Sequence, residues 1–369
     1  MTDNPLVRLA ALGQSPWYDF ITRDLIQSGE LKRLINEDGL QGMTSNPTIF
    51  EKAVGGSNLY DDDIRRLSAD GRNPQAIFEA IAVDDVRAAC DVFRPLYDST
   101  DGIHGLVSIE VSPGAANDTE ATIVEARRLW SLVGRPNAMI KIPATREGLP
   151  AISGCLAEGI NINITLLFAL ERHAQVIEAF FSGLERRATA GKPIDRLRSV
   201  ASFFVSRVDG KVDPMLDKTG DPHEVRGKAA IANACMAYAL FEQQFSTPRW
   251  KKLEGMGAKV QRPLWASTST KDKKYPDIYY VEALIAANTV NTLPPATFDA
   301  YKDHGKPEIR IYQGITRAPA QLEALAKSGV DLAKVTAELE TEGVASFSKS
   351  YESLLAGIES KAGALAGSR

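Results

Sequence analysis

The sequence has few residues that could form disulfide bridges or bind metal ions. Its 369 residues include only three cysteines and four histidines. The cysteines lack the paired spacing of a metal site, and no HExxH motif occurs. We therefore expect no metal or other cofactor, and free thiols in a reducing compartment. The cysteines concerned are Cys90, Cys155 and Cys235.

The chain also lacks long apolar runs and any strong excess of charge. No segment reaches the length of a transmembrane helix, and the N-terminus lacks the basic and apolar pattern of a signal peptide. The net charge of -4 argues against electrostatic binding of nucleic acid, although it allows a local basic pocket for a phosphate. We expect a cytoplasmic protein that binds neither membranes nor nucleic acids.

Short apolar segments alternate with longer helical ones along the chain. This alternation favours parallel strands joined by crossover helices, and eight such units favour a (β/α)₈ TIM barrel. An open, doubly wound sheet is the alternative, but no candidate strand is followed by a GxGxxG motif. The candidate strands are residues 15–20, 41–47, 105–111, 138–143, 161–166, 199–205, 264–267 and 288–292.

Several stretches between and after these strands have helical periodicity. Residues 120–133 place apolar side chains at three- and four-residue spacing, and residues 227–245 form a long, alanine-rich segment. Residues 320–365 are predicted to form further helices, with Asp331 as an N-cap. We expect residues 1–369 to form a single barrel domain with additional helices and a C-terminal helical extension.

One lysine lies inside an apolar strand. Lys141 belongs to the run 138–143, which is short and ends at a proline, so the run is typical of a buried strand. Burial favours the neutral, nucleophilic form of an amine, which can form a Schiff base with a carbonyl substrate. The ordinary alternative is a lysine whose stem packs while its amine reaches water.

Most other candidate strands carry a polar residue at or near the C-terminal end, where a TIM barrel has its active site. Each alone has an ordinary explanation, such as capping the next helix. Together with Lys141 they suit Schiff-base aldol chemistry, in which carboxylates move protons, amides hold sugar hydroxyls and a guanidinium binds phosphate. These residues are Asp19, Asn46, Glu110, Asn163, Thr165, Ser202 and Arg207.

Three blocks of the sequence closely resemble the signatures of the transaldolase family. They are TSNPTIF at 44–50, MIKIPAT at 139–145 and NINITLLF at 161–168. The resemblance continues through residues 202–207, 264–268 and 343–347, so that it covers nearly the whole chain, and the length is similar to that of the longer bacterial members. It implies a class I aldolase-like (β/α)₈ barrel that works without a metal or cofactor.

The resemblance also implies an activity and sugar-phosphate substrates. Transaldolases of the pentose phosphate pathway reversibly transfer a dihydroxyacetone unit from sedoheptulose 7-phosphate to glyceraldehyde 3-phosphate, giving erythrose 4-phosphate and fructose 6-phosphate. Lys141 would form the imine, Asp19 would deprotonate the donor hydroxyl, and a water held by Glu110 and Thr165 would shuttle protons. Substrate binding would fall to Asn46, Asn163, Ser202, Phe204, Arg207, Ser267 and Lys271.

The chain departs from the family pattern after the seventh predicted strand. Many transaldolases have a second phosphate-binding arginine shortly after an Ala-Ser pair. Here Ser267 fits the pattern, but the next four residues end in Lys271 and contain no arginine. Lys271 could supply the charge as a flexible point charge, although an exposed, solvated lysine is an equally good explanation.

Two other functions remain open from the sequence. Fructose 6-phosphate aldolase-like relatives release free dihydroxyacetone, but they are shorter and tend to carry tyrosine where this chain has Phe204. A non-catalytic sugar-phosphate binding barrel would have no need of a buried amine beside two carboxylates. The sequence leaves both a monomer and a homodimer possible, and we expect Trp17 and Trp265 to pack in the core.

Overall fold

The computed structural model describes residues 4–366, which surround a closed barrel of eight parallel strands. The strands follow the chain order, and β1 pairs with β8 to close the sheet. This closure confirms the (β/α)₈ prediction and shows that the open-sheet alternative is wrong. The strands, close to their predicted positions, are β1 (Gln14–Asp19), β2 (Gly42–Thr44), β3 (Leu106–Glu110), β4 (Ala138–Pro143), β5 (Ile162–Leu167), β6 (Ser199–Phe204), β7 (Arg262–Ala266) and β8 (Thr289–Leu293).

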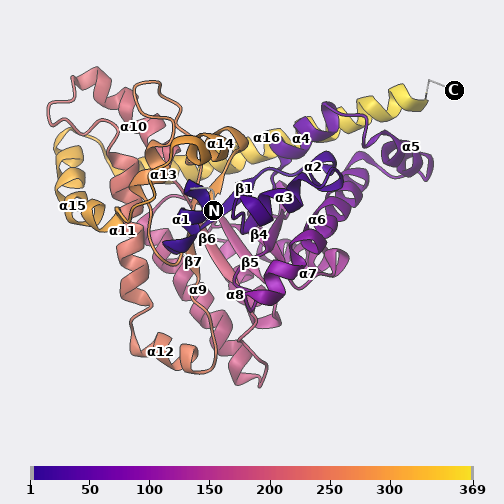
Figure 1. The fold of residues 1–369 in the computed structure, drawn as a ribbon, viewed down its shortest axis with the longest axis horizontal. Coiled ribbons are helices and arrows are strands. Elements are labelled where there is room, and N and C mark those ends of the chain that lie inside the picture. The colour runs from indigo at the N-terminus through magenta and orange to yellow at the C-terminus, as the bar shows by residue number, and fades with distance from the viewer. Residues whose placement is uncertain (1–3, 367–369) are drawn as a thin grey trace.

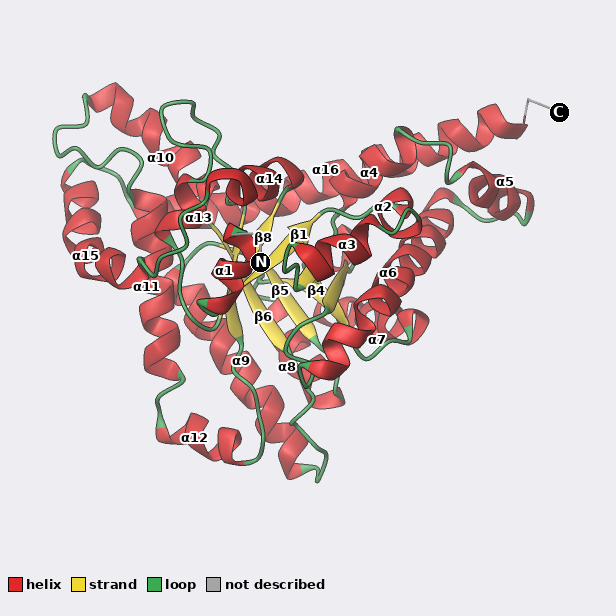
Figure 2. Ribbon diagram, viewed as in Figure 1, coloured by secondary structure: helices red, strands yellow, loops and turns green. Residues whose placement is uncertain are grey.

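Helices enclose the barrel, as Figure 2 shows, and the predicted helices at 120–133 and 227–245 correspond to α7 and α11. None of the described helices is long and apolar enough to cross a membrane. The helices are α1 (Pro5–Ala11), α2 (Arg23–Gln27), α3 (Glu30–Glu37), α4 (Pro47–Gly55), α5 (Asp61–Ala69), α6 (Pro74–Ser99), α7 (Thr119–Val133), α8 (Gly148–Glu158), α9 (Leu170–Thr189), α10 (Ser206–Thr219), α11 (Ala229–Gln244), α12 (Pro248–Gly255), α13 (Tyr279–Ala283), α14 (Pro295–His304), α15 (Ile311–Lys327) and α16 (Leu332–Ala366), with one 3₁₀ turn at Pro113–Ala115.

The strands are continuous apolar runs because both of their faces are buried. One face packs against the helices and the other fills the barrel, so every residue of β4 and β5 is buried. Trp17 and Trp265 are fully buried, as predicted, and neither lines the cavity described below. Trp17 belongs to a cluster with Met139 and Leu264 from other strands, which leaves only the barrel ends open to small molecules.

The long helix α16 runs past the barrel beside α4 and α5 and ends at Ala366 (Figure 1). Asp331 caps it, since Lys334 N donates to Asp331 Oδ1 at 3.1 Å, which confirms the predicted N-cap. Near its start α16 is tied to α10 by the ion pair of Glu338 with Lys211 at 2.7 Å. Near its end Lys361 pairs with Asp61 of α5 at 2.7 Å. The helix is therefore anchored on both sides of the strand ends.

Candidate active site

An open cavity of about 630 Å³ lies at the carboxyl ends of the strands. The strand ends supply most of its floor, because the same end of every parallel strand points to the same face of the barrel. Of the eleven residues predicted for the site, ten line this cavity: Asp19, Asn46, Glu110, Lys141, Thr165, Ser202, Phe204, Arg207, Ser267 and Lys271.

The predicted lysine is held at the cavity floor by two contacts. Lys141 on β4 stands beside Glu110 on β3 in the strand register, and its Nζ lies 3.1 Å from Glu110 Oε2. The same Nζ donates to the backbone carbonyl of Ser45 at 3.1 Å. The two side chains of the ion pair are only 9% and 8% exposed. The amine is therefore fixed in place while it still borders the cavity.

A second carboxylate faces the same space from β1. Thr44 Oγ1 donates to Asp19 Oδ1 at 2.7 Å and lies 2.7 Å from Thr292 Oγ1 on β8, so the carboxylate is oriented by its neighbouring strands. Burial raises the pKa of Asp19, while the nearby Lys141 and the hydrogen bond from Thr44 oppose that change.

Glu110 experiences the same two opposing effects. Burial raises the pKa of Glu110, and the ammonium of Lys141 counteracts the increase. A carboxyl group whose pKa lies above its usual range can both give and take a proton nearer neutral pH than an exposed one. The floor of the cavity thus holds one amine together with two carboxyl groups suited to proton transfer.

Asn163 is the predicted residue that does not line the cavity. It is fully buried, directly opposite Lys141 in the register of β4 and β5. Its Nδ2 donates to Ser108 Oγ at 3.0 Å, and its Oδ1 accepts from Ser202 Oγ at 2.6 Å. The amide thus lies beneath the floor and orients Ser202, which does reach the cavity.

Asn46 has a structural contact as well as a place in the cavity wall. Its Oδ1 accepts from Ile49 N at 3.0 Å and so caps α4. Helix capping, the ordinary explanation for this residue, is therefore found in the structure. The cap uses only the amide oxygen of Asn46, and no described residue accepts a hydrogen bond from the amide nitrogen. One polar atom of Asn46 thus remains for a substrate hydroxyl.

Cations gather in the outer part of the cavity. The Arg207 guanidinium lies 5.0 Å from the centre of the Phe204 ring, and Lys271 Nζ donates to Ser269 Oγ at 2.8 Å. Lys52 of α4, which the sequence analysis did not single out, lines the same space. Asp19 and Glu110 are the acidic residues among the described lining, so the outer part is positively charged.

Comparison with known proteins agrees with this arrangement. Residues 16–358 match the family described as "Transaldolase/Fructose-6-phosphate aldolase". The chain belongs to this family. It is 53% identical over 360 residues to a transaldolase of Acidothermus cellulolyticus, covering 97% of this chain and 96% of that protein. It is also 50% identical over 365 residues to one of Parafrankia sp., covering 98% and 99%. The predicted resemblance is thus confirmed.

Two residues lining this transaldolase-family cavity have a left-handed backbone without being glycine. Leu166 has φ +57° and Ser267 has φ +55°. Leu166 follows Thr165 directly and lies where the register between β5 and β6 shifts. An irregularity in strand pairing changes the direction of neighbouring side chains. A strained backbone conformation is retained only where the surrounding structure stabilises it. The left-handed Leu166 therefore changes the chain direction at the end of β5, directly after Thr165, which is predicted to hold the proton-shuttling water.

Several cavity residues were missed because only the three-dimensional fold brings them to the family site. The block at 343–347 resembled the family, yet nothing in it suggested a role. In the structure α16 forms part of the cavity wall. Within residues 4–366 no group of three or more His, Cys, Asp or Glu side chains could hold a metal ion. The missed residues include Thr44, Lys52, Ser269, Thr292, Gly343, Ser346, Phe347 and Ser350.

Proposed function

We propose that this protein is a transaldolase that moves a dihydroxyacetone unit between sugar phosphates through a Schiff base. The observation that supports this most directly is the buried Lys141 amine, 3.1 Å from Glu110, in the same cavity as Asp19. The reaction is the reversible conversion of sedoheptulose 7-phosphate and glyceraldehyde 3-phosphate into erythrose 4-phosphate and fructose 6-phosphate. We also propose a cytoplasmic location, which the three buried free cysteines support.

The first half-reaction begins with imine formation. Lys141 passes a proton to Glu110 and its amine attacks the ketone carbon of the donor; the carbinolamine hydroxyl then takes up a proton and leaves as water to give an iminium ion. Proton transfers are needed at both steps, and Glu110 lies within hydrogen-bond distance of the amine. Thr165 lines the cavity on the far side of β4 from Glu110, where it can hold a water that carries the proton.

Cleavage follows from the iminium ion, which accepts the electrons of the breaking bond. Asp19 removes the proton of the donor's C4 hydroxyl, the C3–C4 bond breaks, and an aldehyde leaves while an enamine stays on Lys141. An acceptor aldehyde then reacts with the enamine by the reverse steps. Arg207 and Lys271 supply the positive charge that binds the phosphate of either sugar.

Borohydride trapping with fructose 6-phosphate tests this proposal. Reduction should leave a three-carbon adduct that peptide mass mapping locates on Lys141. Lys141→Met should lose the adduct and lower transfer by roughly 10⁴-fold or more, the scale of a lost nucleophile. Lys251→Met changes an exposed lysine whose one ion-pair partner among the described residues is Glu254, and it should retain both the adduct and the transfer activity. Folded protein that forms no adduct on any lysine would refute Schiff-base chemistry.

Phe204→Tyr tests transfer against release of free dihydroxyacetone. The apolar ring lies against Phe168, with centroids 5.3 Å apart, and offers no hydroxyl to activate water at the enamine. A tyrosine hydroxyl would do so, and we expect a higher ratio of released dihydroxyacetone to transferred product. The ratio is measured with and without an acceptor aldehyde. An unchanged ratio would show that Phe204 does not protect the enamine.

A further inference from the structure

The two cations beside the predicted phosphate position come from segments of different rigidity. Arg207 lies in the first turn of α10, whereas Lys271 lies in residues 267–278, which contain no helix or strand. A flexible lysine on an irregular segment loses much of its binding free energy to ordering, unless contacts elsewhere have already ordered its backbone. Those ordering contacts come from a residue far away in the sequence.

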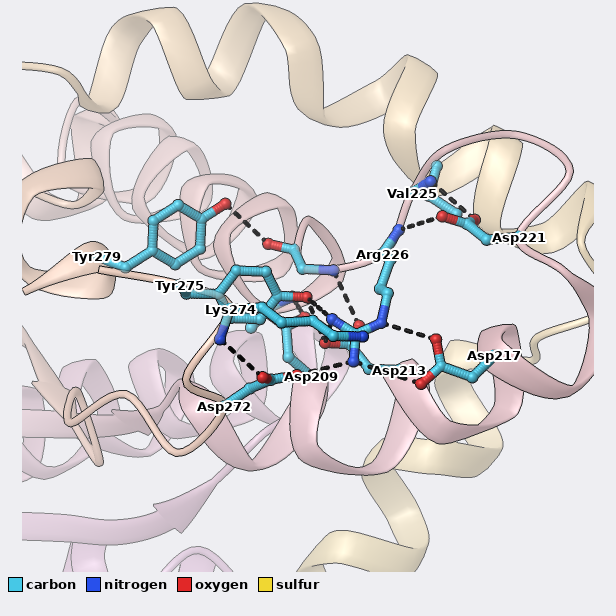
Figure 3. A network of polar contacts seen from close by, with 12 residues as sticks. Asp209, Asp213, Asp217, Asp221, Val225, Arg226, Asp272, Lys274, Tyr275 and Tyr279 are labelled. Atoms are coloured by element: carbon cyan, nitrogen blue, oxygen red, sulfur yellow. Dashed lines mark hydrogen bonds and ion pairs between the residues drawn. The ribbon is translucent and has the colours of Figure 1, made fainter. Parts of the chain in front are cut away.

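Arg226 connects the segment of Lys271 to α10. Its Nη2 donates to Asp272 Oδ2 at 2.7 Å, and its Nε donates to Asp217 Oδ1 at 2.7 Å. Asp272 follows Lys271 directly in the chain, and Asp217 lies on α10. Figure 3 shows the guanidinium between these carboxylates. The Arg226 side chain is 19% exposed, whereas Asp217 and Asp272 are 49% and 33% exposed, so these ion pairs are partly shielded from water.

A partly buried hydrogen-bond network supports the same connection. Tyr275 hydroxyl donates to Asp213 Oδ2 at 2.8 Å, and Gly227 N donates to Asp213 Oδ1 at 2.8 Å. Gly227 has φ +71°, and a Cβ there would lie 2.6 Å from the Tyr275 hydroxyl oxygen, so only glycine allows this approach. Arg226 Nη1 also donates to the Tyr275 hydroxyl. Removal of the Arg226 guanidinium would break its ion pairs with three carboxylates, those of Asp213, Asp217 and Asp272.

Arg207 is held by a different set of contacts. Asp209, two residues further along α10, accepts from Ala230 N at 2.7 Å and from Tyr280 hydroxyl at 3.0 Å. These bonds attach the first turn of α10 to α11 and α13 without involving Arg226. Removing the Arg226 guanidinium should therefore loosen the segment of Lys271 while leaving Arg207 in place.

We propose that Arg226 is a positioning residue that orders the segment carrying Lys271 and so sets the affinity of the cavity for sugar phosphates. It does not reach the cavity itself, since it is absent from the described lining. The proposal rests on the proposed transaldolase function. It explains how Lys271 can bind phosphate although lysine is a flexible point charge, because its backbone is already ordered before substrate binds.

Steady-state kinetics of Arg226→Met test the proposal. We expect the KM for fructose 6-phosphate and for glyceraldehyde 3-phosphate to rise about tenfold, with kcat changed less than twofold. With glyceraldehyde, which has no phosphate, as acceptor, the acceptor KM should stay unchanged. The inhibition constant of inorganic phosphate should rise by the same factor as the KM values of the phosphorylated substrates. Arg226→Lys retains the charge without the planar fork and should give an intermediate KM.

A double-mutant cycle with Lys271 separates positioning from a general structural effect. If Arg226 acts through Lys271, the double variant Arg226→Met, Lys271→Met should be no worse than Lys271→Met alone. Arg249→Met is a matched control because Arg249 also bridges two carboxylates, Glu178 and Glu185, and lies on α12 at the other end of the molecule from α10 (Figure 1). It should leave every KM unchanged.

Three results would overturn the role of Arg226. The first is an unchanged KM for both sugar phosphates in Arg226→Met. The second is an equal loss with the phosphorylated and the unphosphorylated acceptor. The third is full additivity with Lys271→Met. Borohydride trapping on the same variant distinguishes this failure from failure of the proposed function. Wild-type protein without an adduct on Lys141 refutes the Schiff base, whereas an adduct in both proteins with equal KM values refutes only the positioning role.

Discussion

At the scale of single residues, the proposed chemistry depends on two carboxyl groups in similar surroundings with different neighbours. Burial raises the pKa of both Asp19 and Glu110, and the amine of Lys141 opposes the rise in each. Only Glu110 touches the amine, at 3.1 Å, whereas Asp19 is held by Thr44 on the neighbouring strand. This difference supports the proposed division of work, in which Glu110 serves imine formation and Asp19 serves the substrate hydroxyl.

The Asp19→Asn variant tests this division of work. The amide retains the size of the carboxylate and can still accept from Thr44, but it cannot remove a proton. We expect imine formation to persist and transfer to fall by about 10²–10⁴-fold. Borohydride reduction with fructose 6-phosphate should then trap an uncleaved six-carbon adduct on Lys141, where the wild type gives the three-carbon one. A three-carbon adduct formed at the normal rate would assign the cleavage step to another group.

At the scale of secondary-structure elements, α16 closes one side of the cavity and packs on the strained end of β5. A Cβ on Gly343 would lie 3.1 Å from Leu166 Cδ2 and 3.7 Å from Phe168 Cε2. The absence of a side chain at Gly343 therefore lets α16 approach these two residues closely. Leu166 is the residue with φ +57° next to Thr165. The helix therefore packs closely on the side chain of a cavity residue whose backbone is left-handed.

Substitutions at Gly343 test this close contact. Gly343→Leu should lower the free energy of unfolding by about 1–3 kcal/mol through overpacking and should also lower kcat/KM. Gly357 lies in the same helix, and a Cβ added there would meet no atom within 4 Å, so Gly357→Ala is the control. It should raise the free energy of unfolding by about 0.5–1 kcal/mol and leave activity unchanged. Equal effects at both positions, measured by urea unfolding and kinetics, would mean that α16 does not support β5.

At the scale of the whole molecule, the barrel and its surrounding helices bury ionisable groups that link stability to pH. His173 on α9 is fully surrounded, with its ring 5.8 Å from that of Phe203 on β6. The described residues offer its two ring nitrogens no hydrogen-bond partner. Burial lowers the pKa of His173 from 6.5 to about 4. Between these values a proton binds the unfolded chain but not the folded one.

Acid should therefore destabilise the protein through His173. The stabilising contribution is complete above pH 6.5 and is lost as the pH falls toward about 4, because the unfolded state takes up the proton first. Between about pH 7.5 and about pH 5, the free energy of unfolding of the wild type should fall by about 2 kcal/mol more than that of His173→Leu. The exposed His223→Leu is the control for urea titrations. Identical pH slopes for all three proteins would contradict the prediction.

The sequence by itself determined the barrel and most of the candidate site. Apolar runs such as 138–143 end at turn-forming residues, and this local pattern suffices to predict strands. The chain order of parallel strands then places the residues at their ends on one face, so Asp19, Glu110 and Lys141 could be brought together without coordinates. The signature blocks supplied the family, which the comparisons confirmed.

The tertiary structure decided which of these side chains reach the cavity and what supports them. Asn163 stands opposite Lys141 in the strand register, yet it lies beneath the floor because its short amide is held by Ser108 and Ser202, whereas the longer lysine side chain reaches the cavity. Gly343 enters the wall because α16 crosses back over the strand ends. Arg226 and Asp272 are 46 residues apart, and an ion pair over that separation leaves no periodic or local pattern in the sequence. Such contacts exist only once the barrel has closed and its loops have packed together.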